Sequence, residues 1–117
     1  MKSALLSVLS CIFIPCVAFG ASQIPSAFQG KWAVKKDCHI FAEIGTPDGG
    51  VEVTSTEFNR YEYYCKLEKV NNASAKLFSG EFTCAVEGEE SKETIAIKLN
   101  AKGKLSYEGS SLLSKCK

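Results

Sequence analysis

Apolar and polar side chains alternate along most of the chain, and this period of two is the feature that most restricts its fold. At residues 78–87 the even positions hold apolar or small residues, while the odd positions are mostly polar. Neighbouring side chains of a β-strand point to opposite faces, so the pattern predicts a strand with one buried and one hydrated face. Residues 61–68 and 94–99 follow the same pattern. No segment after the first 20 residues shows a sustained apolar period of 3.6, so we expect little helix.

Further short apolar segments bring the expected number of strands to about seven or eight. They lie at Trp32 and Val34, near Ile40 and Phe41, at Val51 and Val53, at Leu105 and Tyr107, and at residues 110–116. Turns that contain Gly, Asn or Ser separate them, which predicts an all-β antiparallel, up-and-down meander. If the first strand pairs with the last, the meander closes into a small β-barrel without exposed strand edges.

The beginning of the chain has the character of a secretory signal peptide. A positive charge at Lys2 precedes an apolar run, and small residues stand at Ala18 and Gly20, where signal peptidase requires them. We expect residues 1–20 to be removed and residues 21–117 to form a single β-barrel domain, periplasmic or secreted. A membrane anchor and a lipoprotein are the alternatives, although the apolar run is shorter than the roughly 20 residues of a spanning helix.

Four cysteines remain after this cleavage: Cys38, Cys65, Cys84 and Cys116. An even number in a small exported chain predicts two disulfides, because such chains fold in an oxidising compartment. If a hairpin turns near residues 73–76, Cys65 lies opposite Cys84 on the apolar face. Cys38 then pairs with Cys116 and joins the early strands to the last one. Three connectivities are possible for four cysteines, and the sequence leaves the other two open.

The balance of charges restricts the class of partner. Lys2 leaves with the signal peptide, so 13 basic residues face 13 acidic residues in the exported chain. Nucleic acids and anionic membranes attract proteins with an excess of basic residues. We therefore expect neither as the main partner, and we expect a monomer without a membrane span and without a cofactor.

No arrangement of residues points to catalysis or to a metal site. His39 is the only histidine, and its neighbours Asp37 and Cys38 do not complete a ligand set, because zinc sites need three or four suitably spaced donors. Cysteines bonded in disulfides are not nucleophiles. The sequence therefore predicts a protein that is not an enzyme.

The segment GKWAVKKDCHI, residues 30–40, carries a resemblance to known families. Gly30 and Trp32 fit the Gly-x-Trp signature of lipocalin-type and avidin-type barrels. With Cys38 and Ile40 after it, the strand is similar to that of the Inh family of bacterial metalloprotease inhibitors, which are small periplasmic barrels. The resemblance implies a lipocalin-like fold and inhibition of a protease. That family carries one disulfide, whereas this chain is expected to carry two.

A longer part of the chain, residues 25–116, resembles uncharacterised proteobacterial periplasmic Gly-x-Trp proteins with four cysteines. Those proteins share an aromatic-Glu-x-x-Cys strand, which here ends at Cys65. They also share a Cys-x-x-Glu-Gly-Glu motif, which here begins at Cys84, and a terminal cysteine, here Cys116. This resemblance implies a periplasmic location and carries no activity with it.

Acidic residues gather in one predicted hairpin turn and form the candidate binding site. They are Glu87, Glu89, Glu90 and Glu93, grouped around Gly88. Such a turn can dock into a basic partner such as a lysozyme cleft, or it can simply be a charged turn that prevents edge aggregation.

Two hypotheses for the function follow. The first is a non-enzymatic binding protein that inhibits a hydrolase, either a protease or a lysozyme, through loops such as residues 45–50 and 87–93. The alternative is a carrier of a small apolar ligand in the barrel mouth. A carrier predicts an apolar cavity of a few hundred Å³, whereas a protein binder predicts a filled interior and an exposed functional loop.

Overall fold

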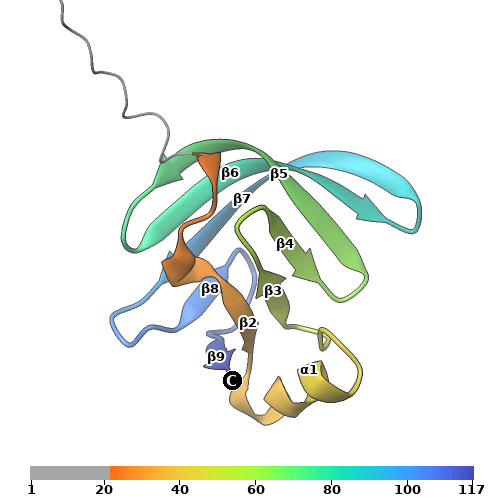
Figure 1. Ribbon diagram of the computed structural model, residues 1–117, viewed down its shortest axis with the longest axis vertical. Coiled ribbons are helices and arrows are strands. Elements are labelled where there is room, and N and C mark those ends of the chain that lie inside the picture. Colours follow the sequence, from red (N-terminus) through yellow and green to blue (C-terminus); the bar gives the residue numbers. More distant parts are fainter. Residues whose placement is uncertain (1–21) are drawn as a thin grey trace, which may run out of the picture.

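Eight antiparallel strands form one sheet in the structure, a computed structural model that describes residues 22–117 (Figure 1). The predicted signal peptide, residues 1–20, lies outside the described residues. The strands are β2 (Gly30–Ala33), β3 (Val51–Val53), β4 (Glu57–Arg60), β5 (Tyr63–Ala73), β6 (Leu77–Val86), β7 (Glu89–Leu99), β8 (Leu105–Tyr107) and β9 (Ser114–Cys116). Each strand from β2 to β7 pairs with the next one along the chain, and β9 returns to pair with β2. The predicted all-β, up-and-down barrel is therefore confirmed.

The barrel closes between β8 and the segment that leads into β9. β9 pairs antiparallel with β2, and Trp32 lies opposite Lys115. Just before β9, Leu113 exchanges two backbone hydrogen bonds with Leu105 of β8, with N···O distances of 2.8 and 2.9 Å. This bridge joins the two edges of the sheet, and it gives backbone groups at those edges a partner.

The interior of the barrel is filled by side chains from the apolar face of each strand. The alternation predicted for β6 is confirmed, because Phe78, Gly80, Phe82 and Cys84 are buried. Val86 was expected on the same face but is 40% exposed, since it ends the strand beside a turn. The core residues outside β6 are Ile24, Phe28, Trp32, Val51, Val53, Phe58, Cys65, Ile97, Leu105 and Leu113.

The segment before β2 packs against this core. It forms the 3₁₀ turn η3 (Ser26–Phe28), and the ring of Phe28 is fully buried, with its centroid 6.2 Å from that of Phe78. The indole nitrogen of Trp32 donates a hydrogen bond to the carbonyl oxygen of Phe28 at 3.0 Å. A buried indole N–H costs free energy unless it is paired, so this bond fixes the segment against the first strand.

Both predicted disulfides are confirmed. Cys65 lies directly opposite Cys84 in the β5–β6 ladder, with a Cα–Cα distance of 4.0 Å. Cys38 is bonded to Cys116 at a sequence separation of 78. Two disulfides are consistent with an oxidising, secreted or periplasmic location. Further along the β5–β6 ladder the register shifts twice, and bulges of this kind increase the local twist of a strand.

One predicted strand is wrong. The run near Ile40 and Phe41 forms the short helix α1 (Cys38–Glu43), so Cys38 begins a helix and does not lie in an early strand. Six residues are too few for a period of two to be distinguished from one of 3.6. The longer-range disulfide therefore joins this helix to β9.

Several strand boundaries also differ from the prediction: β5 extends to Ala73, and β7 already begins at Glu89. A hairpin turn between Arg60 and Tyr63 separates β4 from β5, within a segment expected to be strand from residue 61. Glu62 adopts a φ of 54° in this turn, a conformation that Gly and Asn adopt most readily. Because neither residue type is present in the turn, the sequence gives no signal for it. The last strand is shorter than the predicted residues 110–116.

Helical segments around β2 are short. The 3₁₀ turns η3 and η4 (Lys35–Asp37) have 3 residues each, and α1 has 6. Residues 22–117 contain no helix that is long and apolar enough to cross a bilayer.

Removing the Cys38–Cys116 disulfide is expected to open the barrel at its closing edge. In a C38S/C116S variant the long cross-link is lost, which should lower the free energy of unfolding by about 2–5 kcal/mol. Denaturant unfolding measures this loss. Hydrogen exchange of the Leu105 and Leu113 amides should quicken more than exchange in the β6–β7 ladder. Equal acceleration in both regions would contradict the assignment of this disulfide to the closing edge.

Candidate functional site

The predicted acidic turn connects β6 to β7. Val86 pairs with Glu89, which leaves Glu87 and Gly88 as the two central residues. Their φ values are 52° and 83°. Positive φ at both positions is the pattern of a type I′ turn, whose twist matches that of the strands it joins. The turn therefore continues the ladder directly, and Glu87, Gly88, Glu89 and Glu90 are all exposed.

The predicted site residues do not form one cluster, because strand pairing sends them to different faces. Glu90 pairs with Ala85 on the outer face of the sheet. Glu93 pairs with the buried Phe82, so its side chain is on the inner face. It is half-buried there, and its carboxylate accepts a hydrogen bond from the Ser91 hydroxyl at 3.3 Å. The structure thus separates Glu93 from the rest of the predicted site.

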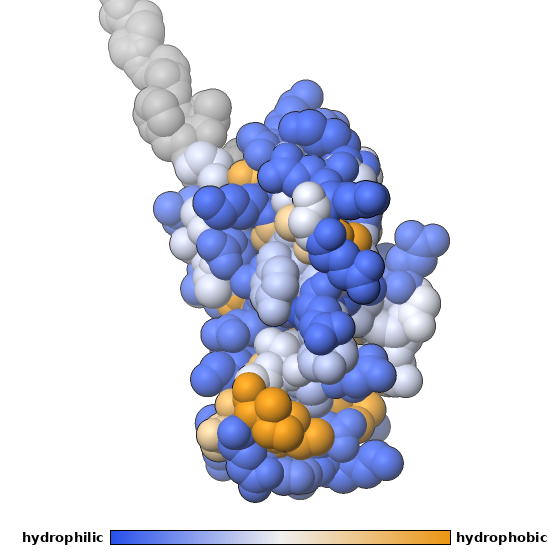
Figure 2. All heavy atoms as spheres, turned by 90° about the vertical axis from the view of Figure 1, so that its right-hand side faces the viewer, coloured by the Kyte–Doolittle hydropathy of each residue, from blue (hydrophilic) through white to orange (hydrophobic). Residues whose placement is uncertain are grey.

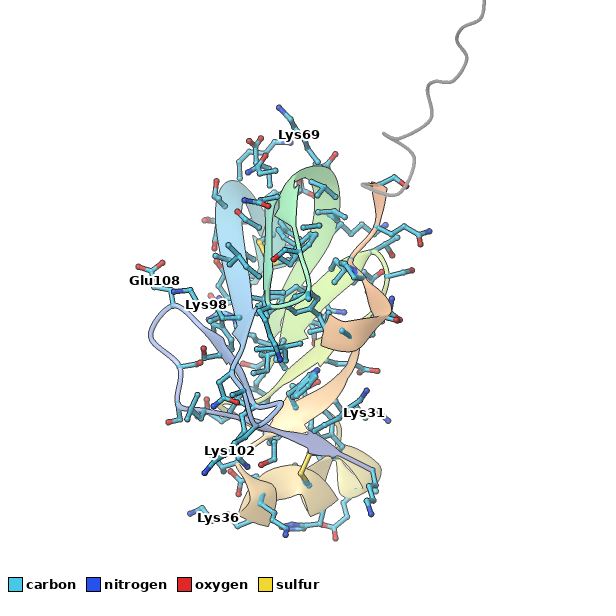
Figure 3. All side chains as sticks on the ribbon, turned by 90° about the vertical axis from the view of Figure 1, so that its left-hand side faces the viewer. Lys31, Lys36, Lys69, Lys98, Lys102 and Glu108 are labelled. Carbon is cyan, nitrogen blue, oxygen red and sulfur yellow. A yellow bond between two sulfur atoms is a disulfide. The ribbon has the colours of Figure 1, made fainter. Side chains whose placement is uncertain are left out.

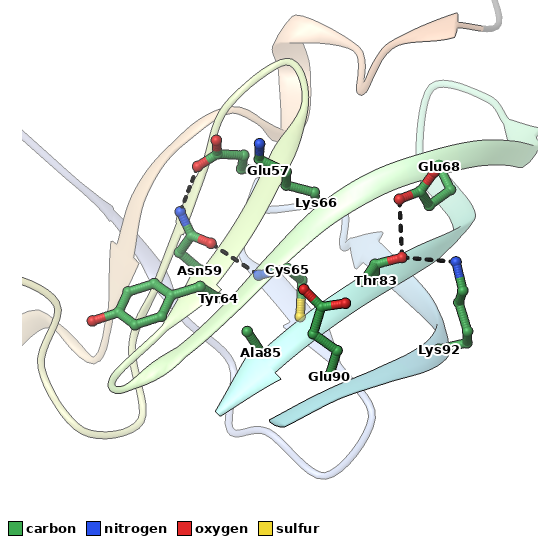
Figure 4. Close-up of a pocket in the computed structure, with 10 residues that line it drawn as sticks. All are labelled: Glu57, Asn59, Tyr64, Cys65, Lys66, Glu68, Thr83, Ala85, Glu90 and Lys92. Carbon is green, nitrogen blue, oxygen red and sulfur yellow. Dashed lines mark hydrogen bonds between the residues drawn. The ribbon is translucent and has the colours of Figure 1, made fainter. Parts of the chain in front are cut away.

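A groove lies beside the acidic turn on the outer face of β4 to β7 (Figure 4). We call it the outer groove; its volume is about 560 Å³. The side chain of Tyr64 in this groove is largely exposed. Two rows of side chains cross its strands: Tyr64, Ala85 and Glu90 in one row, and Lys66, Thr83 and Lys92 in the next. The outer groove and the acidic turn are therefore one continuous surface, joined at Glu90.

Hydrogen bonds hold one side of the outer groove in place. The ammonium of Lys92 donates to the Thr83 hydroxyl at 3.0 Å, and that hydroxyl donates to the Glu68 carboxylate at 2.9 Å. The Lys92 and Glu68 charges are thus joined through one hydroxyl, which limits their freedom to pair with an outside group.

On the opposite side of the groove, the Asn59 amide bridges two neighbours. Its nitrogen donates to the Glu57 carboxylate at 2.8 Å, and its oxygen accepts from the backbone N–H of Cys65 at 3.0 Å. This amide fixes the position of β4 against the start of β5.

The acidic side chains of the turn differ from these bonded groups. Within residues 22–117, the carboxylates of Glu87, Glu89 and Glu90 form no hydrogen bond or ion pair. They are therefore free to pair with an external cation.

The second loop singled out in the sequence, residues 45–50, packs closely on the first strand. Its Pro47 is buried. A Cβ on Gly50 would lie 2.9 Å from both Pro47 Cγ and the Trp32 carbonyl oxygen, so only glycine fits there without a shift. The loop is therefore held in place rather than free to adapt to a partner.

Negative charges from two segments meet at the β4–β5 turn. The carboxylate of Glu62, through its charge and a hydrogen bond, raises the pKa of the Tyr61 phenol above its ordinary value of 10.0, and the charge of Asp48 in the loop just described makes a smaller contribution in the same direction. In Figure 1 the β4–β5 and β6–β7 turns lie on the same side of the molecule as α1. Residues 45–50 come just after α1. This side therefore carries both of the loops expected to contact a partner, residues 45–50 and 87–93.

Hydrophilic residues dominate that side of the molecule. Figure 2 shows them over the hairpins, and it shows a hydrophobic patch towards the lower end, where α1 lies. Ile44, which directly follows α1, is 83% exposed. The acidic turn is thus surrounded mainly by polar surface.

A smaller space, which we call the inner pocket, opens beside residues 93–96 of β7, where β8 does not pair with that strand, and it reaches the inner-face residues Phe58 and Arg60. Its volume is about 250 Å³, and its lining includes Phe58, Arg60, Glu93, Ile95, Tyr107 and Glu108. The charged side chains among them distinguish the inner pocket from the apolar cavity that a carrier predicts. Arg60 was not among the predicted site residues. Its being the only arginine in the chain was the one feature of the sequence that could have drawn attention to it.

Metal-ligating residues are not gathered in the described structure. His39, the only histidine, is exposed on α1. In the part of the chain that the structure describes, no group of three or more His, Cys, Asp or Glu residues is placed to hold a metal ion.

Comparisons of the chain with protein-family models, with curated proteins and with solved structures give no match.

Replacing Glu62 by Gln should lower the pKa of Tyr61 towards 10.0. The tyrosinate is negative, so a neighbouring carboxylate disfavours it, and a neutral amide removes that effect. The Tyr61 ring signals in an NMR pH titration measure the change. Added salt should also reduce the wild-type shift, because salt screens charges at the surface. The matched variant E68Q on β5 should leave the Tyr61 titration unchanged; a similar decrease there would refute the local origin of the effect.

Proposed function

We propose that the protein is an exported, non-enzymatic binding protein that inhibits a hydrolase by docking the acidic turn and the outer groove onto a basic surface of that enzyme. The observation that carries the proposal is the set of unpartnered carboxylates, Glu87, Glu89 and Glu90, on one exposed turn of the described chain. A lysozyme or a protease with a basic cleft has the complementary chemistry.

Rigidity of the hairpin supports the proposal. The Cys65–Cys84 disulfide ties β6 to β5, and Cys84 in turn pairs with Ser91 of β7, close to the turn. Beyond Cys84 the residues of the hairpin are mostly exposed, so the disulfide and the ten paired positions of the β6–β7 ladder hold it in place. A binding element that is already ordered loses less conformational entropy when a partner docks, so more of its interaction energy appears as affinity.

The placement of lysines also supports the proposal. Lys98 and Lys102, which are labelled in Figure 3, lie at and beyond the end of β7 that is farthest from the acidic turn. The acidic turn therefore lies apart from these two lysines, whereas Lys66 and Lys92 line the outer groove beside it. A local negative potential of this kind orients an approaching basic partner and speeds its association.

The outer groove suggests how the contact is made. A lysine or arginine side chain of the partner, entering beside the ring of Tyr64, would reach the free carboxylate of Glu90. Tyrosine is a frequent anchor in protein interfaces because it offers a large apolar ring and a polar end. The leader sequence and the two disulfides support the periplasm or the exterior of the cell as the place of action.

Reversing the charge of the acidic turn should abolish inhibition. In the variants E87K/E90K and E87K/E89K/E90K the turn would repel a basic partner, and affinity should fall by about 100-fold or more. The partner is captured from a periplasmic extract with the wild-type protein, and its hydrolase activity is then measured with and without each variant.

The control variant, E81K/E108K, makes the same change in net charge as the double reversal E87K/E90K, but at residues outside the turn and the outer groove. It should inhibit as the wild type does. Inhibition that survives the reversal at the turn, or that is lost equally in a folded control, would refute the proposed role of the turn. A captured partner whose hydrolase activity is unaffected by the wild-type protein would refute the inhibitory function itself.

A further inference from the structure

Arg60 occupies an unusual position for a cation. It lies at the end of β4, where it pairs with the buried Val51 of β3 and with Tyr63 of β5. Residues directly opposite each other in a ladder share a face of the sheet. The only guanidinium of the protein is therefore directed to the inner face of the barrel, into the inner pocket.

Two tyrosine rings hold the guanidinium in place. Its central carbon lies 4.0 Å from the ring centroid of Tyr63 and 5.6 Å from that of Tyr107. The Tyr107 ring in turn packs edge-on against Phe58, with centroids 5.2 Å apart. Stacking of this kind stabilises the cation and orients its plane, but it satisfies none of its N–H donors.

The side-chain donors of Arg60 are unpaired within residues 22–117. Its Nε atom is buried and has no hydrogen-bond partner. No nitrogen of its guanidinium lies within 4.0 Å of a carboxylate oxygen of the described chain. An unpaired, buried donor on a charged group is costly, and a native protein that retains one requires an explanation.

Two acidic residues line the same pocket without reaching Arg60. Glu93 enters from the inner face of β7, and the exposed Glu108 stands at the rim just after β8, where Figure 3 shows its carboxylate pointing outwards from the loop. A cation and two carboxylates around one small space, with no ion pair between them, are complementary to a molecule that carries both charges. Ile95 and the Phe58 ring supply apolar contacts beside them.

We propose that the inner pocket binds a small zwitterion with the chemistry of an α-amino acid. The carboxylate of the ligand pairs with the Arg60 guanidinium, which presents a fork of donors that fits a carboxylate. The ammonium of the ligand pairs with Glu93, and Glu108 adds negative charge at the rim. The pocket is smaller than the roughly 300–1,000 Å³ of sites for drug-sized ligands, which restricts the occupant to about the size of one amino acid.

The single arginine makes this proposal directly measurable. In a ¹⁵N–¹H spectrum of the labelled protein, the only arginine Nε–H signal belongs to Arg60. Titration with L-leucine should shift that signal along a saturating curve. Isocaproate, which is leucine without its ammonium, and isoamylamine, which is leucine without its carboxylate, should each bind about 10-fold more weakly or worse.

Variants separate the roles of the charges. E93Q should weaken leucine binding by about 10-fold while leaving isocaproate binding no weaker than before. The matched variant E81Q, whose side chain is exposed on β6 and does not line the pocket, should bind leucine as the wild type does. R60K keeps the charge but loses the fork of donors, and it should weaken both leucine and isocaproate.

The proposal fails if leucine up to its solubility limit leaves the Arg60 signal unmoved, since the pocket would then hold only water. It also fails if isocaproate binds as tightly as leucine, or if E93Q leaves the affinity for leucine unchanged. The wild-type titrations and E93Q decide the question even if R60K does not fold. This site is separate from the acidic turn, so none of these outcomes depends on a hydrolase partner.

Discussion

Closure of the sheet is the constraint on which the rest of the structure depends. The two edges of the barrel are β8 and β9, each only 3 residues long, and a bridge between Leu105 and Leu113 joins them. The Cys38–Cys116 disulfide holds β9 from its other end. A short chain buries a limited share of its surface, so covalent links contribute a large part of its stability. Without closure, the core aromatic residues would lose the strands that cover them.

A closed barrel also decides how the functional side chains are distributed. Neighbouring positions in a strand face opposite sides, so one stretch of sequence supplies both an external and an internal surface. Glu90 projects into the outer groove, whereas Glu93, three positions later, enters the inner pocket. A cluster that is acidic in sequence therefore divides into an outer turn and one wall of a separate pocket.

The filled core connects the two proposals physically. Most of the interior is occupied by aromatic and aliphatic side chains, and the inner pocket is bordered by charge at Arg60, Glu93 and Glu108. Such a barrel favours a rigid outer surface for a protein partner and a small charged ligand inside. A bulky apolar ligand would have to displace core residues, and it would remove these charged groups from water without pairing them.

The sequence by itself determined the features that depend on local order: the alternation of faces and the register that places Cys65 opposite Cys84. The inward position of Glu93 was also within reach, since it has the same parity as Ile95. Only the tertiary structure decided that residues 38–43 form a helix, and that Glu62 makes a turn without glycine. It alone brought Arg60 into one pocket with Glu93. Such features arise from contacts between distant strands, and a local pattern carries no information about which distant side chains will meet once the barrel closes.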